Sequence, residues 1–256
     1  MKTIFTKTFS FFLISIFLYS CMGEREARDP LLGREASLYG IGQFANQLLS
    51  ADRFSRLEIE VLYMEGYRPT NQMINGMQEF LETLTHKPEG IQIRDREIPS
   101  QGQETYTIDD VRDLEREHRT LFNEGNTVTI FVIVLDGNFS KDDEETFAIG
   151  AAYQNTSMVL FGPRIHMNSG GFRRPSRALL ETTVSLHELG HLLGLVNNGT
   201  DMVHDHEDEE QEKHCDNQEC LMFWQVETSG LFGFLGNTIP QLDENCLKDL
   251  RANGGR

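Results

Sequence analysis

The apolar and polar positions of the chain predict strands and helices that follow one another in turn. Residues 57–63 alternate apolar with polar side chains, which is typical of a strand with one buried face. Residues 71–85 carry apolar side chains at helical spacing, and 91–98 predict a second strand. Thr107 is a suitable N-cap for a second helix, which we expect to extend to about Phe122.

The next part of the pattern predicts the centre of a sheet and one long helix. Residues 127–135 are continuously apolar and rich in β-branched side chains, so we expect a central strand buried on both faces. Residues 148–153 and 157–165 predict two further strands joined by a turn. A helix should then run from Pro175 to about Leu195, followed by irregular chain and a short helix near the C-terminus. This order of elements predicts an α+β domain with a mixed, twisted sheet.

The composition is consistent with one folded domain and argues against nucleic acid as a partner. The chain has 256 residues, of which 39% are hydrophobic and 25% charged, as in ordinary globular proteins. Lysine and arginine number 23 against 40 acidic residues, so the net charge is −17. Because such a surface repels phosphate backbones, we expect no nucleic-acid partner.

The N-terminal residues have a different pattern from the rest of the chain. Lys2 and Lys7 form a short basic start, and 9–19 follow as an almost unbroken apolar run. The run is too short to span a bilayer comfortably and has the length of the apolar part of a secretory signal peptide.

The end of this run resembles a bacterial lipobox, because 18–21 read Leu-Tyr-Ser-Cys. The resemblance implies a lipoprotein signal peptide over 1–20 and lipid attachment to Cys21. A charged tether over 21–35 and a single domain over 36–256 would follow. We therefore expect an exported bacterial lipoprotein anchored to the membrane through its lipid, either periplasmic or on the cell surface.

Residues 187–191 read His-Glu-Leu-Gly-His and carry the candidate chemistry. On a helix, the spacing of four places His187 and His191 on one face, where both imidazoles can bind one Zn²⁺. Glu188 lies at the edge of that face and can act as general base toward a metal-activated water. The motif therefore predicts a zinc-dependent metallopeptidase, a hydrolase of peptide bonds.

The residues that follow resemble the metzincin clan of zinc metallopeptidases, and the archaemetzincins most closely. The motif of that family reads HExxHxxGxxHCxxxxCxM, followed by PxLCxxC. His187, Glu188, His191 and Gly194 match its first part in order. Residues 214–222 match HCxxxxCxM in full, and 240–246 match PxLCxxC with Asp243 in place of the first cysteine.

This resemblance covers 187–246 and carries expectations about fold, cofactor and substrate. It implies a zincin-like or metzincin-like fold with a long active-site helix, a catalytic Zn²⁺ and a peptide or protein substrate. Met222 would form the Met-turn, an apolar floor beneath the metal. Gly194 would end the helix in a left-handed conformation and let the chain return toward the metal.

The third zinc ligand is left open by the sequence, since 197–213 intervene where the family passes almost directly to its third histidine. Asn197 holds the position by count, but an amide oxygen is a weak zinc ligand. His206 lies inside the insertion. His214 directly precedes Cys215, as the family's third histidine precedes its cysteine. We favour His214, because neutral imidazole is the ligand that zinc prefers.

The cysteines present a second open alternative. In the family the corresponding residues build a structural zinc site, which here would comprise Cys215, Cys220, Cys246 and Asp243. In an exported protein, one disulfide with one remaining thiol is an equally good interpretation.

Two other functions remain compatible with the motif. One is a non-enzymatic surface lipoprotein in which the metal holds the fold. The other is a zinc amidase that acts on a non-protein amide. If the chain is a peptidase, we expect the peptide to lie along an edge strand at 157–161.

Overall fold

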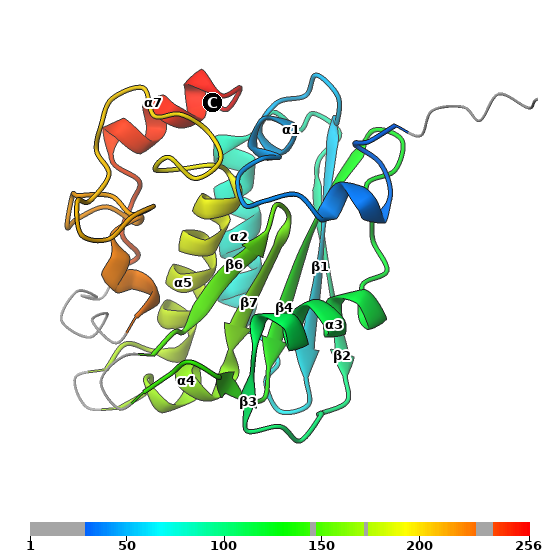
Figure 1. Ribbon diagram of the computed structural model, residues 1–256, viewed down its shortest axis with the longest axis vertical. Helices are drawn as coiled ribbons and strands as arrows, with labels where there is room; N and C mark the ends of the chain where they lie inside the picture. Colours follow the sequence, from blue (N-terminus) through cyan, green and yellow to red (C-terminus); the bar gives the residue numbers. More distant parts are fainter. Residues whose placement is uncertain (1–28, 144–146, 172–173, 229–237) are drawn as a thin grey trace, which may run out of the picture.

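Five strands form the central sheet of the computed structural model, which describes residues 29–143, 147–171, 174–228 and 238–256 (Figure 1). Their order is β2-β1-β4-β7-β6, in which β6 is antiparallel to β7 and the other neighbours are parallel. The strands are β1 Arg56–Met64, β2 Ile91–Ile98, β4 Thr127–Leu135, β6 Gly150–Gln154 and β7 Ser157–Phe161, with a separate pair of β3 Thr105–Tyr106 and β5 Asn138–Phe139.

The helices of the described residues lie on both faces of this sheet. They are α1 Ala45–Leu49, α2 Asn71–Leu84, α3 Ile108–His118, α4 Gly162–Met167, α5 Arg177–Leu192 and α7 Glu244–Ala252, with short 3-10 turns η1 Arg34–Ser37 and η2 Trp224–Glu227. None of the helices in the described ranges combines the length and the apolar character that a membrane span requires. The predicted signal peptide and the lipidation of Cys21 lie outside these ranges, as does the part of the tether before residue 29.

The central strand β4 separates two parts of the apolar core. β4 lies between β1 and β7, and its side chains from Val128 onward are buried on both faces. Val132 faces the core formed with α2 and α5, whereas Phe131 and Ile133 face the core formed with α3. The prediction of a doubly buried strand over 127–135 is confirmed, as is the α+β class with a mixed sheet.

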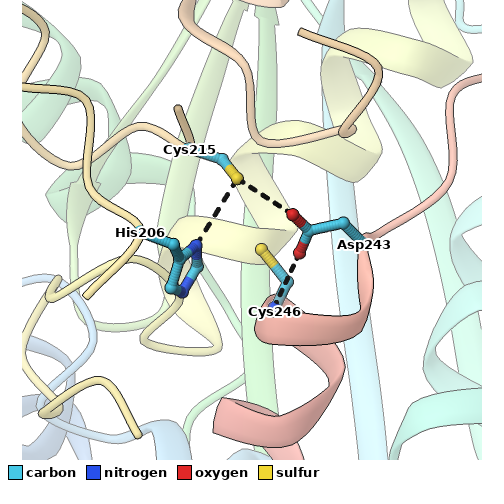
Figure 2. A group of neighbouring side chains, drawn as sticks. All are labelled: His206, Cys215, Asp243 and Cys246. Atoms are coloured by element: carbon cyan, nitrogen blue, oxygen red, sulfur yellow. Dashed lines mark hydrogen bonds between the residues drawn. The ribbon is translucent and has the colours of Figure 1, made fainter. Parts of the chain in front are cut away.

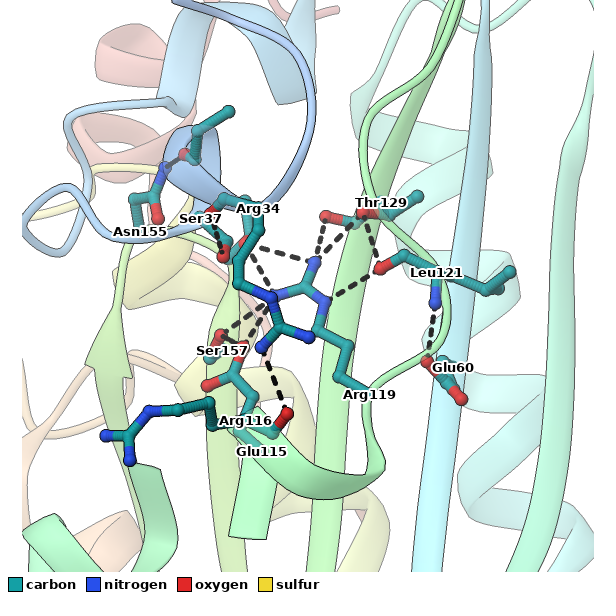
Figure 3. A network of polar contacts seen from close by, with 12 residues as sticks. Arg34, Ser37, Glu60, Glu115, Arg116, Arg119, Leu121, Thr129, Asn155 and Ser157 are labelled. Carbon is teal, nitrogen blue, oxygen red and sulfur yellow. Dashed lines mark hydrogen bonds and ion pairs between the residues drawn. The ribbon is translucent and has the colours of Figure 1, made fainter. Parts of the chain in front are cut away.

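The helix α3 ends at His118, so the expected continuation to Phe122 is wrong. Its start agrees with the prediction, since Thr107 accepts from the Asp110 N–H and Asp110 accepts in return. At Arg119 the backbone turns extended and directs the guanidinium into the protein (Figure 3). There Arg119 binds the Glu115 carboxylate at 2.7 Å and the Thr129 hydroxyl at 2.9 Å. A buried guanidinium needs such partners, and this requirement overrides the helical pattern.

Strand β7 also stops earlier than its sequence suggests. The apolar pattern of 157–165 predicts one strand, but the chain enters α4 at Gly162. A Cβ at Gly162 would lie 2.2 Å from the Tyr67 ring, so only glycine allows this close turn. Pro163 follows in the first turn of the helix, where its missing N–H is harmless.

The edge of the sheet nearest α5 is β6 and not β7. β7 is hydrogen-bonded to β4 on one side and to β6 on the other, so the expectation of an edge strand at 157–161 is wrong. The turn at 154–156 joins the two strands as a hairpin. Because β7 pairs with β4, the preceding strand β6 is left on the outside.

Candidate metal centre

The helix α5 carries the His-Glu-Leu-Gly-His motif in the interior of the protein. The Ser176 side chain caps its start by accepting from the Leu179 N–H at 3.1 Å. His187 and Glu188 are fully buried, and His191 is 5% exposed. Burying two imidazoles and a carboxylate costs free energy unless they are hydrogen-bonded or bind a metal ion. The helix therefore places a polar face where the fold would otherwise favour apolar side chains.

His214 meets the two helical histidines. The ring centroid of His214 lies 5.3 Å from that of His187 and 5.1 Å from that of His191. The Nε2 atoms of His187 and His191 are 3.1 Å apart. One nitrogen from each of the three rings lies within 4.8 Å of the others, a spacing that suits a shared metal ion. We call His187, His191 and His214 the three-histidine centre.

Each Nδ1 atom of the three-histidine centre has a partner behind it. The His187 Nδ1 lies 2.8 Å from the Leu221 carbonyl oxygen, and the His214 Nδ1 lies 3.0 Å from that of Glu212. The His191 Nδ1 lies 3.2 Å from the Asn198 amide. Such outer contacts fix the orientation of metal-binding imidazoles and direct Nε2 inward. The sequence contains no motif that identifies these partners, because two of them are backbone carbonyls.

Glu188 connects the helix to the edge strand. Its Oε2 accepts a hydrogen bond from the Ala152 N–H of β6 at 2.7 Å. A Cβ on Gly150 would lie 3.1 Å from the Glu188 Oε1 and 2.8 Å from Val184. The absence of a side chain at Gly150 therefore makes room for the carboxylate beside the sheet edge.

The expected end of the helix agrees with the structure. Gly194 has φ +81° and follows Leu193, the C-cap of α5, so the chain leaves the helix in the left-handed conformation that was expected. Met222 is fully buried beneath the helix, and its Sδ would lie only 2.3 Å from a Cβ on Gly190. Glycine at 190 thus allows the segment with Met222 to approach α5 closely.

The other two candidates for the third ligand lie elsewhere. Asn197 is exposed, and its side-chain amide donates to Glu207 at 3.0 Å. His206 is buried in a second group of possible metal ligands, with Cys215, Asp243 and Cys246 (Figure 2). One side-chain atom from each of these four residues lies within 4.8 Å of the others.

The remaining cysteine, Cys220, adjoins this second group. The Sγ atoms of Cys220 and Cys246 are 3.7 Å apart, far beyond the length of a disulfide bond. Cys215, Cys220 and Cys246 are free thiols, and we call them the thiol cluster. Hydrogen bonds from the thiols of Cys215 and Cys246 lower the pKa of Cys220 to about 4. The cluster therefore favours at least one thiolate, the form that binds metals.

Comparison with solved structures identifies proteins with a similar fold. No family model and no curated protein matches the chain. Among solved structures it is similar to an archaemetzincin from Methanopyrus kandleri, with 15% identity, a TM-score of 0.51, and coverage of 78% of this chain and 97% of that one. The chain has an archaemetzincin-like fold. The expected fold is thereby confirmed over most of the domain.

Two further solved structures have lower TM-scores. A zinc-dependent peptidase from Methanocorpusculum labreanum is 16% identical, with a TM-score of 0.48 and coverage of 75% of this chain and 99% of that one. Metalloproteinase-II from Bacteroides fragilis is 14% identical, with a TM-score of 0.43 and coverage of 80% of this chain and 54% of that one.

Proposed function

We propose that this protein is a zinc-dependent peptidase with the three-histidine centre as its zinc site and Glu188 as its general base. The observation that supports this most directly is the convergence of one nitrogen from each of three imidazoles within 4.8 Å, two of them from the part of α5 that also carries the buried carboxylate of Glu188. The archaemetzincin-like fold supports the same proposal, and in this chain α5 packs against β6, the strand at the end of the sheet.

The residues fit zinc in both number and chemistry. Three neutral imidazoles are a ligand set found in catalytic zinc sites, which keep a fourth position for water or substrate. Bound there, zinc would act as a Lewis acid that lowers the pKa of water and polarises the carbonyl to be cleaved. The carbonyl partners of the His187 and His214 Nδ1 atoms would hold these two rings in the tautomer that presents an unprotonated Nε2.

Glu188 would move the proton during cleavage. Its carboxylate would accept a proton from the attacking water and then donate it to the amine of the departing peptide. The Ala152 N–H, at 2.7 Å, would hold the carboxylate in position without neutralising it.

The substrate would lie along the outer edge of β6, beside Glu188. A peptide can add to an exposed strand through backbone hydrogen bonds, with alternate side chains reaching pockets. β6 is the strand at the end of the sheet, and its neighbour Ala148 forms an antiparallel bridge with Thr228. That bridge would limit the substrate at one end of the strand, so 150–154 would provide the pairing edge.

The decisive experiment compares Glu188→Gln with the wild type on a mixed peptide library, with zinc per chain measured in both. We expect cleavage to fall by about 10²–10⁴-fold while zinc content is unchanged. Glu209→Gln, on the exposed part of the insertion, is the matched control and should cleave normally. Zinc binding with no cleavage by either protein would favour a non-enzymatic lipoprotein, and equal cleavage by both would exclude Glu188 as the base. Cleavage of non-protein amides alone would favour an amidase.

We also propose a second zinc ion on the thiol cluster, in place of a disulfide. The free thiols and the 3.7 Å distance between the Sγ atoms of Cys220 and Cys246 support this choice. Zinc analysis should then give two ions per chain. Titration of the unfolded, metal-free protein should find Cys215, Cys220 and Cys246 all reactive. A result two thiols short of this number would instead support a disulfide.

For location, we propose that lipid on Cys21 anchors the protein to a membrane after export. The basic start, the apolar run and the cysteine support this proposal. Cys21→Ala should abolish incorporation of labelled fatty acid and move the protein from the membrane fraction to the soluble fraction. Retention of label by that variant would refute the lipid anchor.

A further inference from the structure

His206 is the one buried residue of the insertion 197–213, all of which the structure describes. Its side chain is 1% exposed, although acidic and exposed residues surround it in the sequence. The Nδ1 lies 3.4 Å from the Sγ of Cys215 (Figure 2). The Nε2 lies 2.9 Å from the Oδ2 of Asp249. An imidazole held between a carboxylate and a thiol has the arrangement of a metal ligand with its outer partner.

Asp243, by contrast, is already used by the backbone. Its Oδ1 accepts from the Cys246 N–H at 2.9 Å and thereby caps the start of α7. Its Oδ2 accepts from the Asn217 amide and from the Cys215 thiol, each at 3.3 Å. A carboxylate that caps a helix stabilises it by about 0.5–2 kcal/mol and would lose part of that on binding a metal. Asp243 is therefore the weaker candidate for a fourth ligand.

We propose that His206 completes the thiol cluster as the fourth metal ligand, with Asp249 as the residue that orients it. This inference rests on the zinc chemistry proposed above but not on peptide cleavage. Tetrahedral zinc with Zn–S bonds of about 2.3 Å places two sulfurs about 3.8 Å apart, and a sulfur and an imidazole nitrogen about 3.6 Å apart. The distances of 3.7 Å between Cys220 and Cys246 and 3.4 Å between Cys215 and His206 agree with these values.

The position of His206 also connects this site to the three-histidine centre. Cys215 directly follows His214, and Glu207 forms an antiparallel bridge with Cys215. The Asp208 N–H donates to the His214 carbonyl oxygen at 2.8 Å. A metal ion bound by His206 and Cys215 would fix both sides of this bridge and hence the backbone that carries His214.

A second connection passes through Cys220. Leu221 follows it, and the Leu221 carbonyl oxygen is the partner of the His187 Nδ1. Two of the three rings therefore depend on segments that the thiol site holds. We infer that metal at the thiol site raises the metal affinity of the three-histidine centre, by a factor of about 5–150 if the coupling is typical. By linkage, the reverse effect has the same factor.

Cobalt(II) substitution of the full chain tests the ligand, because thiolate-to-cobalt charge-transfer absorption arises only at the thiol site. We expect His206→Ala to weaken cobalt binding at that site by at least about tenfold, and Asp249→Asn by about 10–100-fold. His204→Ala, an exposed histidine of the same insertion, is the matched control and should bind as the wild type does. Wild-type affinity and spectrum in His206→Ala would overturn the proposal.

His206→Cys keeps the test decisive if His206→Ala does not fold. A fourth thiolate should raise the charge-transfer intensity by about one third, in proportion to the number of sulfur ligands. An unchanged intensity in folded, cobalt-loaded His206→Cys would show that residue 206 is not a ligand. The double variant His187→Ala/His191→Ala should retain the band, which separates this test from the failure or success of the peptidase proposal.

The coupling is tested by zinc competition with a chromogenic chelator. His206→Ala should lose affinity at both sites, whereas His204→Ala should lose it at neither. If His206→Ala weakens metal binding at the thiol site but keeps wild-type affinity at the three-histidine centre, the coupling is refuted and the thiol site acts alone.

Discussion

The three-histidine centre and the thiol cluster lie next to each other but differ in how the chain builds them. Two histidines of the first come from one regular helix, α5, with the carboxylate of Glu188 beside them. The second is assembled from irregular segments and the first turn of α7, and its residues are at most 2% exposed. His214, in contrast, is partly exposed.

Under the proposed function, this difference distinguishes a site that can react from a site that holds structure. Catalytic zinc keeps a position for substrate and needs a base within reach, whereas structural zinc is enclosed by four protein ligands. Glu188 follows His187 on α5 and is hydrogen-bonded to the edge strand β6. The thiol cluster instead contains Cys215 and Cys220, the chain neighbours of His214 and Leu221. Metal at this closed site can therefore position the residues of the open three-histidine centre.

Selective removal of metal from the three-histidine centre should have the largest effect on peptide cleavage. Its failure would contradict the distinction between an open and a closed metal site. Limited treatment with a chelator should remove zinc from the open three-histidine centre first. Because metal-ion catalysis contributes several kcal/mol, peptide cleavage should fall by about a hundredfold or more, and added zinc should restore it. Zinc analysis during the treatment should find one ion retained.

Removal of the second zinc ion, from the thiol cluster, should then lower the stability of the folded protein. Metal present at about 1,000 times its dissociation constant stabilises the folded state by about 4 kcal/mol, so the free energy of unfolding should fall by that order. Thermal unfolding at each stage of chelation measures this. Loss of both ions in one step, with activity and stability falling together, would contradict the distinction between an open and a closed site.

The sequence could predict the regular part of this structure and the helical half of the site. Periodic apolar positions are local, so 127–135 and the helix with His187 and His191 follow from the sequence directly. The ends of elements follow less well, because they depend on contacts made elsewhere in the fold. Arg119 ends α3 by entering the interior, and Gly162 ends β7 through its approach to Tyr67.

The parts that sequence could not predict all depend on topology. Which strand lies at the edge is decided by the pairing of β7 with β4, which no local pattern records. His206 resembles any histidine of a solvated acidic loop until the fold places it against Cys215 and Asp249. Its separation of 43 residues from Asp249 leaves no motif to identify the pair.

Asn198→Ala should have the next largest effect, a loss of metal affinity at the three-histidine centre that leaves the thiol cluster unchanged. The Asn198 amide lies 3.2 Å from the Nδ1 of His191, and loss of such a partner typically lowers metal affinity by 10–100-fold. The thiolate-to-cobalt band should not change in intensity at saturating cobalt. Asn197→Gly is the matched control, because glycine tolerates the positive φ of 54° at that position. A larger loss of zinc in Asn197→Gly would instead make Asn197 the third ligand.

Gly190→Ala should have the smallest effect, on the contact between α5 and Met222. The new Cβ would lie 2.3 Å from the Met222 Sδ, and overpacking of this kind costs about 1–3 kcal/mol. Alanine also favours a helix over glycine by about 1 kcal/mol, so we expect a net loss of up to about 2 kcal/mol in denaturant unfolding. Gly40→Ala, at an exposed position where only the Gln43 side chain is near, should change stability by less than about 0.5 kcal/mol. If Met222→Ala reverses part of the loss in the double variant, the clash is its cause, whereas strictly additive losses would show that Met222 does not pack against residue 190.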